Sequence, residues 1–214
     1  MNDSRWKFWL PRAGCLLGVI VVFWWAPPFH IVDLKGAQQA QPAFDAVAFV
    51  DNFWSEQLGK SLDRATDAVV LIKAIHADSR AAREKYGRSA GLGSDYYFFM
   101  SGEGRVVSVG AHEIAISLEP DGSSTDVILE TGNIFGNAVR DGTGLLNVSD
   151  FADSQDFNAV SAEINRRIEE QVLPNLRPKA VVGAIVHFAG CAEIADEGTD
   201  LHPLLVVPVS ATVR

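Results

Sequence analysis

The chain has 214 residues, enough for one domain of ordinary size and an appendage but not for two full domains. Hydrophobic residues make up 48% and charged residues 21% of the sequence, a balance typical of packed globular proteins and not of disordered ones. The formal net charge is −9, from 18 basic and 27 acidic residues. This charge argues against nucleic acid as a partner, because phosphate backbones bind clustered positive charge.

An apolar segment without charge, residues 13–26, follows three basic residues and precedes two prolines. Fourteen residues of helix cover about 21 Å of a hydrocarbon core of roughly 30 Å, so residues 8–10 must join the span while Arg12 reaches the headgroups. Tryptophans flank the run on both sides, as in aromatic belts, and the preceding basic residues indicate a cytoplasmic N-terminus. We therefore expect residues 1–32 to form a cytoplasmic tail and a single-pass membrane anchor.

Two other fates of this segment fit its residues less well. Signal peptidase needs small residues at positions −3 and −1, but cleavage after Ala26 places Trp24 at −3. A lipoprotein cysteine follows the apolar run, whereas Cys15 precedes most of it. A retained anchor leaves 15 basic and 26 acidic residues beyond residue 32, a net charge of −11. It also separates Cys15 from Cys191 across the membrane, so no disulfide is expected.

Residues 33–42 are polar, rich in Gln and Ala, and end in proline, which predicts a tether. Residues 43–90 carry two apolar stripes at helical spacings of three and four, over residues 44–58 and 62–75. We expect an antiparallel helical pair, with Gly59 as the first C-cap, Ser61 as the second N-cap and Gly87 as the final stop.

From Tyr96 the hydrophobic period changes from about 3.6 to 2, which indicates that the strands start there. Later apolar residues return to helical spacing, and two further β-rich runs close the sequence. The predicted order is strands at 105–109, 113–118 and 125–130, a helix capped by Asp153 or Ser154 and ending at Pro174, then strands at 180–188 and 204–213, with Pro208 marking an edge or bulge.

Three strands, one helix and two strands is the order of the oligonucleotide/oligosaccharide-binding (OB) barrel. We therefore predict an α+β fold: a small five-stranded antiparallel OB-like barrel or sheet with one long helix over residues 91–214. Other α+β sheets share this order of elements, so the topology remains open. Residues 43–214 are expected to form one folded unit.

Residues 132–158 hold the densest group of polar and turn-forming side chains, but no recognisable catalytic or cofactor motif. The glycines match neither a dinucleotide fingerprint nor a phosphate-binding loop. The histidines and Cys191 lack ligand-like spacing, and no nucleophile elbow is present. We therefore predict no cofactor, no metal and no catalytic residue.

Four residues of this region are candidates for ligand binding. Arg140 beside Asp141 forms either a buried ion pair that fixes the loop or a contact to an anionic or hydroxylated ligand. Asp150 begins a run of acidic residues spaced by three, a pattern typical of capping and solvation. Asn158 completes the set. The aromatic run 96–99 either fills the core or stacks on a sugar.

Six segments of the sequence carry a family resemblance through their order and spacing: REKYG (83–87), SGEGRVV (101–107), AVRD (138–141), residues 147–167, VVGAIVHFAGC (181–191) and LLVVPVSATV (204–213). Together they resemble the bacterial predicted periplasmic lipoproteins of domain-of-unknown-function family 2291. The resemblance runs from residue 44 to the C-terminus. It implies a periplasmic protein often encoded beside sugar-type ABC importers, with no established reaction. One departure is the lack of a properly placed lipobox, so a protein anchor is expected in place of a lipid.

Together these features predict a non-enzymatic accessory or binding protein at the outer face of the inner membrane. Its expected partners are ABC importer subunits or a small sugar-like solute. One alternative is an envelope hydrolase acting on glycans, with Asp141 and Asp150 as acid and base roughly 5–9.5 Å apart. The other is a structural scaffold that uses the apolar stripe containing Trp54.

Overall fold

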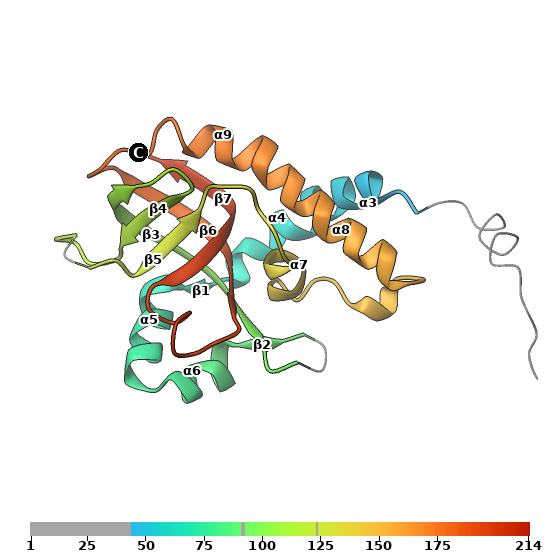
Figure 1. Cartoon of the computed structure of the whole chain (residues 1–214), viewed down its shortest axis with the longest axis horizontal. Coiled ribbons are helices and arrows are strands. Elements are labelled where there is room, and N and C mark those ends of the chain that lie inside the picture. Colours follow the sequence, from blue (N-terminus) through green and yellow to red (C-terminus); the bar gives the residue numbers. More distant parts are fainter. Residues whose placement is uncertain (1–43, 91–92, 123) are drawn as a thin grey trace, which may run out of the picture. The chain divides into compact units, whose positions relative to one another are not determined.

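Five strands close into a barrel in the computed structural model, which describes residues 44–90, 93–122 and 124–214 (Figure 1). The ring order is β3-β4-β5-β7-β6, and a pairing between β3 and β6 closes it. The predicted anchor and tether, residues 1–32 and 33–42, lie outside the described residues. The barrel strands are β3 (Tyr96–Val109), β4 (Glu113–Ser117), β5 (Val127–Glu130), β6 (Ile185–Ile194) and β7 (Leu204–Val213).

The α+β class and the five-stranded OB-like barrel are confirmed, with one change of strand direction. All the neighbouring barrel strands pair antiparallel except β5 and β7, which are parallel. A closed ring with an odd number of strands cannot alternate direction at every step, so at least one pairing must be parallel. An entirely antiparallel closed barrel of five strands was therefore wrong on geometric grounds alone.

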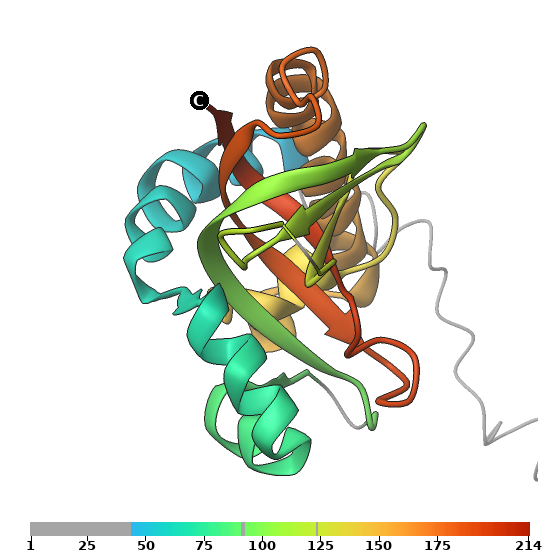
Figure 2. The same cartoon turned by 90° about the vertical axis from the view of Figure 1, so that its left-hand side faces the viewer.

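Strand β3 begins at Tyr96, where the hydrophobic period changes as predicted, and it is much longer than the predicted run at 105–109. Residues 96–105 pair with β6, and residues 105–109 pair with β4. Gly104 makes this change of partner possible, since a Cβ there would lie 2.3 Å from Ile116 Cγ2 and 2.6 Å from the Ser117 carbonyl oxygen. Figure 2 shows the curved path of β3 that results.

The helices of residues 43–90 begin and end at other residues than predicted. The first helix continues through Gly59 and does not end there. The side chain of Ser61 makes no N-cap hydrogen bond. The second helix is instead capped by Asp67, which accepts a hydrogen bond from Val70 N at 2.9 Å. The predicted stop at Gly87 is confirmed. The elements are α3 (Ala46–Asn52), the π-helix η1 (Phe53–Leu58), α4 (Gly59–Ser61), η2 (Leu62–Arg64), α5 (Ala68–Ala77) and α6 (Ser79–Tyr86).

These helices do not form the predicted antiparallel pair. Helix α3 packs against α8, the long helix (Ser154–Arg167), whereas α5 packs against β3 and α6 (Figure 1). Phe49 of α3 stacks edge-on with Phe151, 5.2 Å between ring centroids, and Asp51 forms an ion pair with Arg167 of α8. Each apolar stripe thus covers a different part of the molecule.

The connection from β5 to β6 contains the long helix as predicted. Asp153 caps α8 by accepting hydrogen bonds from the backbone N–H groups of Gln155 and Asp156. The helix does not end at Pro174 but passes through a π-turn and stops at Leu176. The connection comprises α7 (Ala138–Gly142), η3 (Val148–Asp150), α8, η4 (Ile168–Val172) and α9 (Leu173–Leu176).

The last two strands pair as a hairpin. The predicted bounds of β7 are confirmed, whereas β6 begins at Ile185, later than expected. Between Ala189 and Gly190 the register shifts, so that Ser210 and Pro208 are successive partners on β7. The bulge predicted from Pro208 is therefore present, with Val209 as the residue that has no partner on β6.

Candidate functional site

Arg140 and Asp141 form a buried ion pair on α7. The guanidinium donates from Nε and Nη2 to the two carboxylate oxygens, at 2.8 and 2.9 Å, and the side chains are only 7% and 9% exposed. The same guanidinium lies 3.8 Å from the ring centroid of Phe157. This confirms the structural reading of the pair, which ties α7 to α8.

Asn158 joins this cluster from α8, whereas Asp150 does not. Arg140 Nη1 donates to Asn158 Oδ1 at 3.0 Å and to the Phe157 carbonyl oxygen at 3.4 Å. These bonds occupy most of the five guanidinium N–H groups, so Arg140 has little capacity left for a ligand. Asp150 lies in η3 with its side chain exposed.

The two carboxylates of the hydrolase alternative therefore have unrelated surroundings. Asp141 is held on both oxygens by one arginine, and Asp150 faces solvent on a different element. An acid–base pair needs two carboxyl groups that face one substrate across a cleft. This arrangement does not favour a glycan hydrolase.

A cleft of about 320 Å³, here called the Arg140 cleft, opens beside the ion pair. Its floor contains the apolar side chains of Leu146 and Phe157, and its polar groups come from three separate segments. β2 (Arg88–Ser89), a two-residue strand paired with β3, supplies one wall. The lining residues are Arg88, Ser89, Ala90, Arg140, Asp141, Leu146, Asn147, Val148 and Phe157.

Arg88 is the residue of this cleft that sequence reasoning missed. Its guanidinium lies against the turn at Gly144, where a Cβ would fall 2.6 Å from Arg88 Nη1. Gly144 also has φ +69°, so glycine is required there for both the backbone conformation and the close approach. No carboxylate in the described part of the chain lies within ion-pair distance of Arg88.

Strands β3 and β6 contribute a second polar pair, Tyr97 and Glu193, whose electrostatics the Asp141 charge affects. The Tyr97 hydroxyl donates to Glu193 Oε1 at 3.3 Å from directly opposite positions on β3 and β6. Burial raises the pKa of the Glu193 carboxyl, while the Tyr97 hydrogen bond lowers it and the Asp141 charge raises it. Burial together with the Glu193 charge also raises the pKa of Tyr97.

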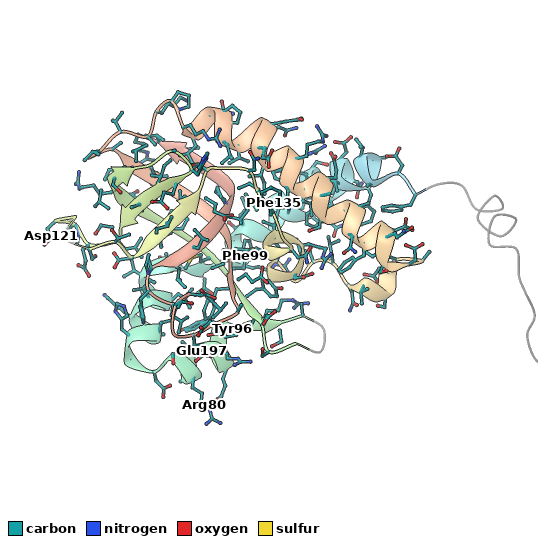
Figure 3. The ribbon with its side chains drawn as sticks, in the orientation of Figure 1. Arg80, Tyr96, Phe99, Asp121, Phe135 and Glu197 are labelled. Atoms are coloured by element: carbon teal, nitrogen blue, oxygen red, sulfur yellow. The ribbon has the colours of Figure 1, made fainter. Side chains whose placement is uncertain are left out.

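Asn158 also lines a second cleft of about 400 Å³ together with Phe135, whose side chain is labelled in Figure 3. Phe135 is 77% exposed, yet its loop is held at both flanks. Glu169 Oε1 accepts from Ile134 N at 2.7 Å, and the Gly136 carbonyl accepts from side chains of α8. The aromatic run at 96–99, in contrast, mainly fills the core, as expected: Tyr96, Tyr97 and Phe98 are at most 5% exposed.

The predicted periplasmic lipoprotein family DUF2291 matches residues 19–212. The chain belongs to the DUF2291 family. Membership places it among envelope-associated periplasmic proteins, in agreement with the resemblance seen in the sequence. No protein with a curated function is significantly similar to the chain.

An OB-fold protein from Thermotoga maritima has the same architecture as this DUF2291 chain. Its crystal structure superposes with a TM-score of 0.71 and 22% sequence identity, covering 81% of this chain and all of that one. At this identity the likeness establishes the fold alone. Among residues 44–214, no helix of the DUF2291 chain has the length and apolarity needed to cross a membrane.

The buried ion pair predicts a large loss of stability when one partner is removed. Arg140→Ala leaves the Asp141 carboxylate buried without its cation, which should lower the free energy of unfolding by about 3–5 kcal/mol. Urea denaturation of the detergent-solubilised full chain measures this. Arg80→Ala, which removes an ion pair whose side chains are 86% and 69% exposed, is the control and should cost at most about 0.5 kcal/mol. Equal effects of the two changes would show that the Arg140 pair does not fix the loop.

The raised pKa of Glu193 predicts the sign of a pH effect. A carboxyl group with a higher pKa in the folded than in the unfolded state opposes folding at neutral pH, and this opposition fades as pH falls through the raised pKa. Glu193→Gln should therefore stabilise the DUF2291 chain at pH 7, and the gain should shrink as pH is lowered toward 4. Thermal unfolding of both chains across this range tests it. A gain that grows on acidification would contradict the assignment.

Proposed function

We propose that this DUF2291 protein is a non-enzymatic binding protein that is anchored in the inner membrane, binds a small sugar-like solute, and assists a sugar-type ABC importer. The observation that carries the proposal is the Arg140 cleft, a small concavity with an apolar floor and polar groups from several segments. Small-molecule sites are typically built in this way.

The polar groups of the cleft suit a hydroxylated ligand. Arg88 offers a guanidinium without a carboxylate partner, and Ser89 offers a hydroxyl group. Asn147 uses its Oδ1 to accept from Ser149, which leaves its amide N–H groups for a ligand. In this site Arg140 and Asp141 act as the rigid wall, and Asn158 fixes Arg140 from behind. Of the four predicted site residues, Arg140 and Asp141 line this cleft, whereas Asp150 and Asn158 do not.

The anchor supports the proposal through effective concentration. The apolar segment of residues 13–26, with basic residues before it and a polar tether after it, favours a single-pass anchor with a cytoplasmic N-terminus. A tethered binding domain reaches a nearby membrane partner at an effective concentration in the millimolar range, so a weak interface is sufficient. The association with an importer is inferred from the family resemblance alone.

Solute binding predicts stabilisation by ligands at millimolar concentration. A thermal-shift panel of neutral sugars, sugar acids and sugar phosphates on the solubilised full chain should contain at least one ligand that raises Tm. Saturation at 100 times Kd corresponds to about 2.7 kcal/mol of stabilisation. Arg88→Ala should weaken that ligand about tenfold by titration calorimetry, because it removes a charge-assisted hydrogen bond.

The control for this experiment is Arg80→Ala. Arg80 is an exposed arginine on α6 whose side chain points away from the barrel (Figure 3). Its loss should leave ligand affinity unchanged. A panel without any stabilising ligand, or a ligand insensitive to Arg88, would remove the basis of the proposed solute site.

Importer association predicts co-purification that depends on the anchor. The full chain, affinity-purified from gently solubilised membranes, should bring down ABC importer subunits identified by mass spectrometry. A chain with residues 1–32 replaced by a cleaved secretion signal loses the gain in effective concentration and should recover these subunits at about a hundredth of the yield or less. Absence of importer subunits from the full-length sample would refute the association.

A further inference from the structure

A third cleft, of about 580 Å³, lies where two π-helical turns meet the last barrel strand. It is here called the Trp54 cleft. Trp54 comes from η1, and Gln171 and Val172 come from η4. π-turns are uncommon and often mark functional positions. The remaining lining residues are Asn175, Lys179 and residues 209–213 of β7.

The floor of this cleft is a strand edge that β5 leaves uncovered. β5 pairs only with residues 204–206 of β7, because the chain leaves the barrel after Glu130. On its other side, β7 pairs with β6 up to Val213. Beyond Val206, no described strand pairs with the outer edge of β7. Alternate residues of an antiparallel strand direct their N–H and C=O groups away from the paired neighbour, so residues 209–213 offer about 17 Å of open strand edge.

Trp54 forms an apolar wall at a fixed position beside this edge. The indole is half-buried, and the guanidinium carbon of Arg167 lies 5.7 Å from its ring centroid. Arg167 is in turn held by its ion pair with Asp51. Because the ring is held in place before any partner arrives, packing a side chain on it costs little conformational entropy.

Lys179 gives the cleft a positive charge within a strongly acidic domain. It is exposed, and none of the carboxylates in residues 44–214 that the structure describes forms an ion pair with it. The chain beyond residue 32 carries a net charge of −11. A carboxylate on the incoming molecule can therefore form an ion pair with Lys179, although the net negative charge of the domain repels it elsewhere.

We infer that the Trp54 cleft binds an extended peptide segment bearing a carboxylate, which adds a strand to the open edge of β7. Backbone pairing supplies a ladder along residues 209–213, Trp54 receives an apolar side chain, and Lys179 receives the carboxylate. A sugar ring is shorter than this edge and lacks the alternating backbone groups that match it. The site is independent of the Arg140 cleft, and it provides the kind of surface through which a protein partner can dock.

Selection of peptides on the full chain in nanodiscs tests this inference. A displayed library of random hexapeptides is panned, and the most enriched hexapeptide is synthesised with a fluorescent label for anisotropy titration. Strand addition requires N–H groups at every second peptide position. Proline substitution should therefore weaken binding about tenfold or more at alternate positions and much less at the positions between them.

Variants of the cleft identify where the peptide binds. Trp54→Ala should weaken binding about tenfold or more, as at interface hot spots. Lys179→Glu is an exposed charge reversal that leaves the core intact, and it should reverse the preference between a hexapeptide with a C-terminal carboxylate and its amide. Phe135→Ala removes an exposed aromatic ring from a different cleft and should change affinity less than about twofold.

Three outcomes would overturn the inference. One is a proline scan without alternation, because the peptide would then not pair as a strand. Another is binding that Trp54→Ala and Lys179→Glu leave unchanged. The third is failure to enrich any hexapeptide while a neutral sugar quenches Trp54 fluorescence, measured in a full chain whose other four tryptophans are replaced by phenylalanine. Loss of solute binding on Arg88→Ala bears only on the Arg140 cleft.

Discussion

The change of partner within β3 is the constraint on which the rest of the structure depends. One strand must pair with β6 over its first ten residues and with β4 over its last five, or the sheet cannot close. Gly104 lies at the point of change, where a Cβ would collide with Ile116 and with the Ser117 backbone. Glycine weakens a flat strand, but at a barrel corner it lets two backbones approach closely. Closure thus depends on the absence of one side chain.

The way in which the five-stranded ring closes determines which strand edge is left uncovered, namely the part of β7 beyond Val206. The one parallel pairing among the five barrel strands, β5 with β7, is short because β5 ends at Glu130 and the chain then passes through α7 and α8 before β6 begins. That excursion contributes residues to both the Arg140 cleft and the Trp54 cleft. Its first part brings Arg140 and Asn147 opposite Arg88, and its last part lays η4 and α9 beside the uncovered half of β7.

Local sequence signals predicted those features whose causes are local. Asp153 caps α8 through its own side chain, Pro208 marks the bulge because proline has no N–H to donate, and Arg140 finds Asp141 one residue away. The change of period at Tyr96 was predicted, but the continuous course of β3 through Gly104 was not, because the two strands that pair with it are distant in the sequence. The helical pair was wrong for a related reason: an apolar stripe specifies that a face is buried but not which surface covers it.

The clefts are harder to predict than the elements because each draws its lining from segments far apart in the chain. Arg88 and Asn147 meet only after β2 pairs with β3 and α7 packs on the barrel, and Trp54 meets Lys179 only after α3 packs on α8. Within an acidic domain, Arg88 and Lys179 are informative because each lines a cleft and neither has a carboxylate partner among the described residues. Arg64, Lys73 and Lys85 also lack such a partner, but they line neither of these clefts, so position and free donors together make Arg88 and Lys179 candidates for binding a molecule outside the chain.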